Sequence, residues 1–319
     1  MIYIAALVLL EILLFFTNYR PGTFLIGWDN IMPEFNIWLN LQRSIFGVWQ
    51  DYRGLGILDG MAQTANLFHT IYIFLLSLVL PQELLRYAFI MLSHLLGGVG
   101  FFFLVSYLFR EEGARTNKKI FFLAGAMFYM FNLGVIQMFF APLEVFVIHF
   151  AALPWLALFI TKALKNPRPL NLLILFITSL LFSPQGFVPT IFVVFCILLG
   201  ALSFVHMIKT KNFKTGIMVI LTVLLANAFW LLPYSYSAIK NQTVIRNTRI
   251  NEFSSEEIFY RNKAHGDLKS VATLKGFMLT SIEYDQAFKG DVLFMLKWYQ
   301  HYNSLPYQIL FGAVLLTAF

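Results

Sequence analysis

The stretch that decides the fold is LLRYAFIMLSHLLGGVGFFFLVSYLFREEGARTNKK, residues 84–119. Residues 84–109 are almost entirely apolar, and a helix needs about 20 such residues to cross the hydrocarbon core of a bilayer. The connection that follows, 110–119, carries four basic and two acidic residues. A long apolar run that ends in a basic connection predicts a membrane span whose end faces the cytoplasm.

The composition of the whole chain is that of a membrane protein. Of its 319 residues 59% are hydrophobic and only 12% are charged, whereas soluble domains have about 25% charged residues. The one cysteine, Cys196, excludes an intrachain disulfide and a cysteine-based metal site. The net charge of +7 does not indicate a nucleic acid partner, because the basic residues lie in short connections between apolar runs.

Further apolar runs predict an all-α fold, a polytopic helical membrane protein. The predicted spans are about 2–17, 84–109, 119–134, 145–164, 170–183, 187–208, 215–233 and a truncated one at 306–319. The first run lacks a basic start and a small-residue cleavage site, so we interpret it as a retained span. Because the last run is short for a span, we expect the natural chain to continue past residue 319.

The orientation follows from three basic connections, 110–119, 162–168 and 209–214. Together they hold ten basic and two acidic residues, a sum of +8, so the rest of the chain nets −1. All three face the cytoplasm only if the apolar run 67–80 does not cross. We therefore interpret 67–80 as a helix in the outer interface or a shallow re-entrant helix. The N-terminus is then cytoplasmic, and 18–83 and 234–305 are large external loops.

The first external loop contains an interfacial helix. In PEFNIWLNLQRSIFGVW, residues 33–49, aromatic and aliphatic side chains recur at helical spacing on one side and polar ones on the other. Such a helix lies in the plane of the membrane, with tryptophans at headgroup level. Asp29 precedes it and therefore sits near the outer end of the first span.

This layout resembles the GT-C superfamily of polytopic glycosyltransferases, most closely its YfhO-type and arabinofuranosyltransferase-type members. The matching stretches are GWDNIMPEF (27–35), VWQDYRGLG (48–56), ANLFHTIYIFLLSLVLP (65–81) and NAFWLLPYS (227–235). The resemblance covers the first seven spans. It implies a GT-C-like fold and transfer of a sugar, on the outer face of the membrane, from a polyprenyl-phosphate donor to a surface glycan, lipid or protein.

The resemblance implies that Asp29 is the catalytic base or binds the acceptor, since a carboxylate of the first external loop has that role in the family. Glycosyl transfer to a hydroxyl requires a positioned base and a group that stabilises the departing phosphate. Whether a divalent metal stabilises the departing phosphate is left open. Two alternatives are a transporter or flippase of lipid-linked precursors and a non-catalytic accessory protein. Because the two halves lack repeat symmetry, the transferase is favoured over the transporter.

Other polar residues are candidates for substrate binding. They are Glu34, Arg43, Asp51, Arg53, Asp59, His69, Glu144 and Gln185. Each also has a structural alternative: Asp29 can cap a helix, Asp51 can pair with Arg53, and the histidines can be bonded polar residues at membrane depth. For Glu11, in the middle of the first span, we expect a bond to a neighbouring helix.

Overall fold

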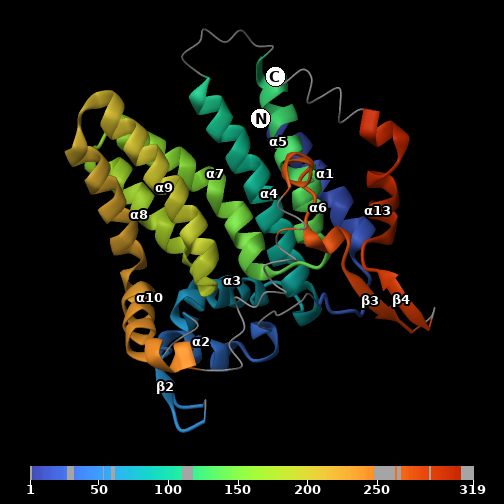
Figure 1. The fold of residues 1–319 in the computed structure, drawn as a ribbon, viewed down its shortest axis with the longest axis horizontal. Coiled ribbons are helices and arrows are strands. Elements are labelled where there is room, and N and C mark those ends of the chain that lie inside the picture. The colour runs from blue at the N-terminus through green and yellow to red at the C-terminus, as the bar shows by residue number, and fades with distance from the viewer. Residues whose placement is uncertain are drawn as a thin grey trace. The chain divides into compact units, whose positions relative to one another are not determined.

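The computed structural model describes residues 2–26, 32–52, 54–58, 62–109, 118–247, 263, 267–286 and 289–309. It is mostly helical (Figure 1). The chain forms two compact units, residues 1–130 with 141–247 and residues 131–140 with 248–319. We call them unit 1 and unit 2 and describe each by itself.

Unit 1 is a bundle of long helices. They are α1 (Ile2–Asn18), α4 (Gln82–Leu108), α5 (Lys118–Phe131), α7 (Glu144–Lys165), α8 (Pro169–Leu181), α9 (Pro189–Thr210) and α10 (Phe213–Asn247). Proline at the first position suits the start of α8 and of α9, because the amide there needs no partner. Asn212 caps α10 by accepting a hydrogen bond from the amide of Thr215 at 3.1 Å.

Four of these helices, α4, α7, α9 and α10, are long and apolar enough to cross a membrane, within the part of the chain that the structure describes. A fifth span is reached if Lys119–Phe131 and Leu133–Phe140 form one broken span. The helices α1 and α8 are apolar but shorter, with 17 and 13 residues. The chain is therefore an α-helical protein with the features of membrane embedding.

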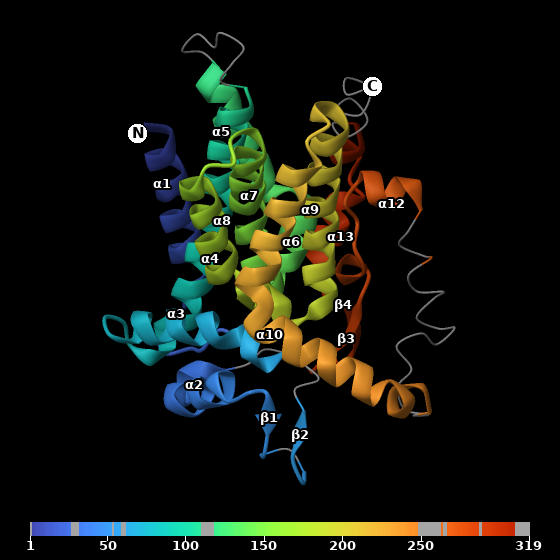
Figure 2. The ribbon, with the colours of Figure 1, turned by 90° about the vertical axis from the view of Figure 1, so that its left-hand side faces the viewer.

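Short elements of unit 1 lie across one end of this bundle (Figure 2). They are η1 (Pro33–Phe35), α2 (Ile37–Ile45), the hairpin β1 (Trp49–Gln50) and β2 (Ile57–Leu58), η2 (Gln63–Asn66) and α3 (Leu67–Ser77). Asn36 caps α2 through the amide of Leu39 at 3.1 Å. Trp38 of α2 packs on Phe74 of α3, with ring centroids 5.6 Å apart. The sequence predicts helices in both places, and α3 with 11 residues is too short to span a bilayer.

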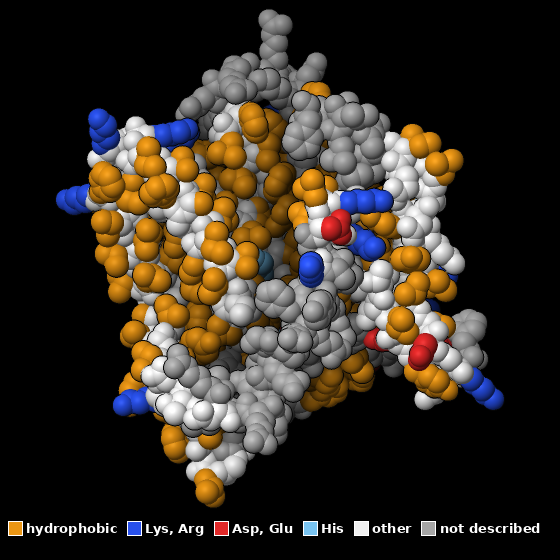
Figure 3. Space-filling model, viewed as in Figure 1, with side chains coloured by type: hydrophobic (Ala, Val, Ile, Leu, Met, Phe, Trp, Pro, Cys, Tyr) orange, Lys and Arg blue, Asp and Glu red, His pale blue; other side chains and the backbone are white. Residues whose placement is uncertain are grey.

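The connections α7–α8 and α9–α10 lie at the opposite end of the bundle (Figure 2). Lys and Arg side chains gather there, while hydrophobic side chains cover the flank of α8, α9 and α10 (Figure 3). Ile197 and Leu225 on this flank are 67% and 65% exposed, as expected of side chains that contact lipid rather than water. The buried core of the same helices is centred on Trp230, whose side chain is fully buried.

The structure differs from the sequence prediction in three places. The helix α10 continues to Asn247 instead of ending at 233, because Pro233 is accommodated within it. Residues 133–140 form the helix α6, which lies mostly between the predicted spans 119–134 and 145–164. Two short hairpins are present in a chain predicted to be all-α. Each difference concerns polar or short segments, in which apolar periodicity carries little information.

Unit 2 comprises α6 (Leu133–Phe140), α12 (Leu268–Ala272), η5 (Phe277–Leu279), the antiparallel strands β3 (Ile282–Asp285) and β4 (Gly290–Leu293), and α13 (Leu296–Tyr302). The buried Gln137 holds it together: its Nε2 donates to the carbonyl of Leu274 at 2.8 Å, and its Oε1 accepts from the amide of Gly276 at 2.9 Å. Phe140 packs edge to face on Phe294 at 5.0 Å. The residues 310–319, most of the predicted last span, lie outside the described part.

Candidate functional site

A buried arginine binds two carboxylates at the end of the bundle where α2 and α3 lie. The Nε of Arg86 is 2.9 Å from Oε1 of Glu34, and its Nη2 is 3.2 Å from Oε1 of Glu144. The three residues come from α4, η1 and α7, and each is at most 6% exposed. Buried charges are stable only when they are paired and hydrogen-bonded, so this geometry requires all three side chains.

His69 of α3 completes this group, which we call the carboxylate cluster: Glu34, His69, Arg86 and Glu144. Its Nε2 lies 3.8 Å from Oε1 of Glu144, and its ring packs on Phe89 at 4.6 Å between centroids. Burial, with Arg86 nearby, lowers the pKa of His69 to about 3, so the imidazole is neutral at neutral pH.

The backbone around Glu34 is held in place as well as its side chain. Pro33 starts the turn η1, and Nε2 of Gln82, at the start of α4, donates to the carbonyl of Glu34 at 2.8 Å. The first loop is therefore attached to α4 by a side-chain ion pair and by a backbone hydrogen bond. This attachment fixes the position of the Glu34 carboxylate.

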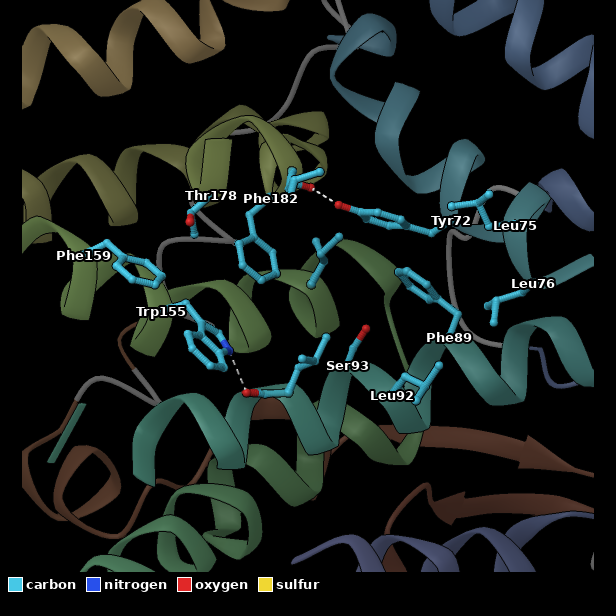
Figure 4. Close-up of a pocket in the computed structure, with 13 residues that line it drawn as sticks. Tyr72, Leu75, Leu76, Phe89, Leu92, Ser93, Trp155, Phe159, Thr178 and Phe182 are labelled. Carbon is cyan, nitrogen blue, oxygen red and sulfur yellow. Dashed lines mark hydrogen bonds between the residues drawn. The ribbon is translucent and has the colours of Figure 1, made fainter. Parts of the chain in front are cut away.

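An apolar cavity of about 500 Å³ lies between α3, α4, α7 and α8 (Figure 4). Aromatic rings of Tyr72, Phe89, Trp155 and Phe182 line it together with leucines. Two hydrogen bonds hold its walls: Tyr72 Oη donates to the carbonyl of Leu181 at 2.6 Å, and Trp155 Nε1 donates to the carbonyl of Leu96 at 2.9 Å. These bonds leave the apolar faces of the two rings for the cavity (Figure 4).

The cluster and the cavity share three helices in a matching register. Each helix carries one cluster residue and, one turn away, one residue that lines the cavity. The pairs are His69 and Tyr72 on α3, Arg86 and Phe89 on α4, and Glu144 and Ile148 on α7. Residues three or four apart lie on the same face of a helix. The cluster therefore lies at one end of the cavity, and charge gives way to apolar surface within one helical turn.

Two further buried polar pairs lie in unit 1. His149 Nδ1 and Gln185 Oε1 are 2.8 Å apart, and Gln185 is completely buried in the turn η4, Ser183–Phe187. His94 Nδ1 and Glu11 Oε2 are also 2.8 Å apart, and His94 Nε2 lies 3.1 Å from the carbonyl of Met130. The expectation that Glu11 bonds to a neighbouring helix is confirmed, since it joins α1 to α4.

In the His149–Gln185 pair, Nδ1 of the imidazole donates to the amide oxygen, because that oxygen only accepts. In the second case a carbonyl only accepts, so Nε2 of His94 carries a proton. One shared proton then lies between His94 and Glu11, and the pair has no net charge. A pair without net charge is suited to the interior of a membrane bundle.

The structure brings three of the predicted site residues together, Glu34, His69 and Glu144. Gln185 pairs with His149 instead. The guanidinium of Arg43 stacks on the ring of Tyr52 at 4.3 Å, and Asp51 is exposed in the connection between β1 and β2. The candidates Asp29, Arg53 and Asp59 lie outside the described residues, so their roles stay predictions.

Arg86 was missed by the sequence reasoning. A signal was present, because an arginine near the end of an apolar run is costly and is kept only where it has partners. The cavity was not predictable, since its residues come from four separate apolar helices. Among the described residues no group of three or more histidines, cysteines or acids is placed to hold a metal ion. Both nearby carboxylates already bind Arg86, so the described residues do not fit a divalent metal.

The comparisons with known proteins return no family. Protein-family models, curated proteins and solved structures were compared with the chain, and none of them matches it. The functional argument therefore rests on the residues themselves.

Proposed function

We propose that the chain is a membrane glycosyltransferase of the GT-C type that transfers a sugar from a polyprenyl-phosphate donor to a surface glycan, lipid or protein on the outer face of the cell membrane. The observation that carries this proposal is the register of the cluster and the cavity. A lipid-linked sugar has a polar head and a long apolar tail. The chain offers a charged cluster that adjoins an apolar cavity of about 500 Å³.

The cavity suits the first part of an isoprenoid tail. Along α7 its lining runs from Ile148 to Phe159, eleven steps that span roughly 16 Å at about 1.5 Å per residue. Leu92 and Leu96 on its rim are 47% and 43% exposed. The cavity is thus open at the flank of the bundle, and a lipid can enter it from the bilayer without its tail passing through water.

The cluster suits the hydroxyl chemistry of the transfer. A base removes the proton of the acceptor hydroxyl, the oxygen attacks the anomeric carbon, and the bond from that carbon to the phosphate oxygen breaks. The phosphate leaves with the bonding electron pair. Asp29 is the base that the resemblance implies, and Glu144 is a described carboxylate one helical turn from the cavity-lining Ile148. Arg86 positions the carboxylates, since it binds both Glu34 and Glu144.

The leaving phosphate needs a cation other than Arg86, because Arg86 already binds both Glu34 and Glu144. Arg43, on α2 and half-buried, is the described candidate, and Arg53 is the second candidate from the same loop. Cations that face a developing negative charge lower the barrier most when water is excluded. The orientation that this requires has the first loop outside and the N-terminus in the cytoplasm.

The test uses the protein reconstituted in vesicles with radiolabelled polyprenyl-phosphate sugars. Leu92→Trp fills the cavity, whereas Ile197→Trp adds the same side chain to the exposed flank of α9. We expect label to move to an acceptor with the unchanged protein and with Ile197→Trp, and transfer to fall about tenfold or more with Leu92→Trp.

The same experiment distinguishes the alternatives. A donor that carries a photoreactive group in its first isoprene units should label α4 or α7. Labelling without any transfer would identify a protein that binds or moves lipid-linked sugars and would overturn the transferase proposal. Equal transfer by both tryptophan variants would show that the cavity is not the donor site.

A further inference from the structure

Unit 2 contains its own pocket, which is separate from the chemistry proposed above. It has a volume of about 190 Å³. One wall is made of Trp298, His301 and Tyr302 of α13 together with Tyr307, and the floor is made of apolar side chains at and just before α6. A cavity of this size holds about six water molecules, at about 30 Å³ for each water in the liquid. It therefore accommodates one small ring.

The rings of this wall support one another. His301 lies 5.4 Å from Tyr307 and 6.2 Å from Trp298, and Tyr302 lies 5.7 Å from Tyr307, measured between ring centroids. Tyr302 is buried, and its hydroxyl and that of Thr273 are 3.0 Å apart. Because this contact holds the ring of Tyr302 in place, the wall is a preformed surface.

Two further contacts stiffen the same wall. The Nε2 of Gln308 donates to the carbonyl of Tyr302 at 2.7 Å, and Asn303 Nδ2 donates to the carbonyl of Tyr299 at 2.8 Å. The turn between α13 and Tyr307 is thereby tied to the last turn of the helix. A ligand that enters the pocket meets rings that lose little conformational freedom on binding.

We propose that this pocket binds a single uncharged sugar ring. A pyranose has an apolar face of C–H groups and a rim of hydroxyls, so it needs an aromatic face together with polar groups at the edge. Trp298 supplies both, since its ring is apolar and its Nε1 is a hydrogen-bond donor. The imidazole of His301, which is exposed, adds a hydrogen-bonding group at the rim.

The charges around the pocket argue against the other common ligand of aromatic pockets, a quaternary ammonium ion. The Nζ of Lys275 lies 5.8 Å from the ring of Tyr302, and Lys297 lies next to Trp298 on α13. The described surroundings thus already place a cation over one ring of the wall. A second cation would be repelled, whereas a neutral sugar would not be.

This inference goes beyond the proposed transfer reaction, because sugar binding in unit 2 can be measured without a donor or a turnover. If both proposals hold, the pocket binds the acceptor glycan by its terminal residue. The two proposals can fail independently. The transfer assay and the binding measurement together distinguish a transferase whose unit 2 binds no sugar from a sugar-binding protein without transferase activity.

The experiment is saturation-transfer NMR on the full chain in detergent micelles. The probes are the methyl glycosides of glucose, galactose and mannose, N-acetylglucosamine, and choline chloride, each at millimolar concentration. We expect saturation of ring C–H protons of at least one sugar and none of choline. Trp298→Ala should weaken the apparent affinity about tenfold, the loss of about 1.4 kcal/mol from one stacked ring. Trp298→Phe should restore most of it.

Trp49→Ala is the matched control, since Trp49 is an exposed tryptophan of unit 1. It should leave the saturation unchanged. The proposal is overturned if no sugar of the panel is saturated, if choline is preferred, or if Trp298→Ala and Trp49→Ala behave alike. If the Trp298→Ala protein fails to fold, the proposal is still tested, because the unchanged protein and Trp298→Phe must both show sugar saturation.

Discussion

Arg86 and Glu34 form an ion pair of 2.9 Å although one lies on a long apolar helix and the other in the first loop. Both side chains are nearly inaccessible to water. The pair therefore attaches the loop to α4, and Arg86 extends the attachment to α7 through Glu144. This relationship accounts for the positions of Glu34, Arg86 and Glu144 in the carboxylate cluster.

Replacing Arg86 by leucine should destabilise the fold strongly. Loss of one partner of a buried ion pair leaves uncompensated charge and costs about 3–5 kcal/mol. The free energy of unfolding can be measured by titration with a denaturing detergent in mixed micelles. The triple variant that adds Glu34→Gln and Glu144→Gln should recover part of the loss. A small effect of Arg86→Leu alone would mean that water reaches the cluster.

The contribution of His69 to the stability of the protein should fall in mild acid. Its pKa in the folded state is lowered to about 3, from 6.5 for an unperturbed imidazole. Between these pH values the unfolded state binds a proton that the folded state excludes, so the free energy of unfolding decreases as the pH falls. The contribution is complete above about pH 7 and is lost toward pH 3, at up to about 1.4 kcal/mol per pH unit.

The measurement compares the unchanged protein with His69→Gln from pH 7 to pH 4. The variant cannot titrate at this position, so its stability should depend less steeply on pH. His206→Gln, on α9, serves as the control and should keep the slope of the unchanged protein. Identical slopes for all three proteins would show that His69 is protonated in the folded state or reached by water.

Gly97→Ala should destabilise the bundle by about 1–3 kcal/mol, the usual cost of overpacking. A methyl group at Gly97 would clash with Cε1 of Phe150. That ring cannot easily yield, because it is buried and stacked against Tyr129 and His94. Gly200→Ala on α9 is the matched control, with no atom within 4 Å of the added methyl group. It should be neutral or slightly stabilising, since alanine favours helix more than glycine does.

The two ends of the bundle should lie on opposite sides of the membrane. Single cysteines are introduced at Val79, which is 78% exposed after α3, and at Asn166 in the basic α7–α8 connection, in a Cys196→Ala background. Val79→Cys should react with an impermeant thiol reagent in intact cells, and Asn166→Cys only after permeabilisation. The reverse pattern would invert the proposed orientation, and reaction of both in intact cells would contradict the topology.

Asp29→Asn should lower sugar transfer about 10²–10⁴-fold, the share that a general base contributes. The amount of folded protein should hardly change, because a helix cap, the structural alternative for Asp29, contributes only about 1 kcal/mol. Asp291→Asn, an exposed acid of β4, is the control and should keep normal transfer. Normal transfer by Asp29→Asn together with a large loss in Glu144→Gln would assign the base to Glu144 instead.

The sequence by itself determined most helices of unit 1 and the polar stretch between the first two predicted spans. Apolar runs of span length can form only helices in a bilayer, so the predicted ranges and the observed helices coincide to within a few residues for α1, α4, α7, α8 and α9. The 33–49 pattern likewise predicted α2, since an amphipathic period identifies a helix from local information.

Only the tertiary structure decided which polar residues meet. Glu34, His69, Arg86 and Glu144 belong to four separate elements, and no local pattern indicates that Arg86 binds two of the others. The cavity and the pocket of unit 2 are likewise made by segments far apart in the sequence. Helix formation depends on neighbours within one turn, whereas a site depends on how faces of different helices pack. The physical reason is that packing buries one face of each helix against another, and the sequence alone does not show which faces will contact each other.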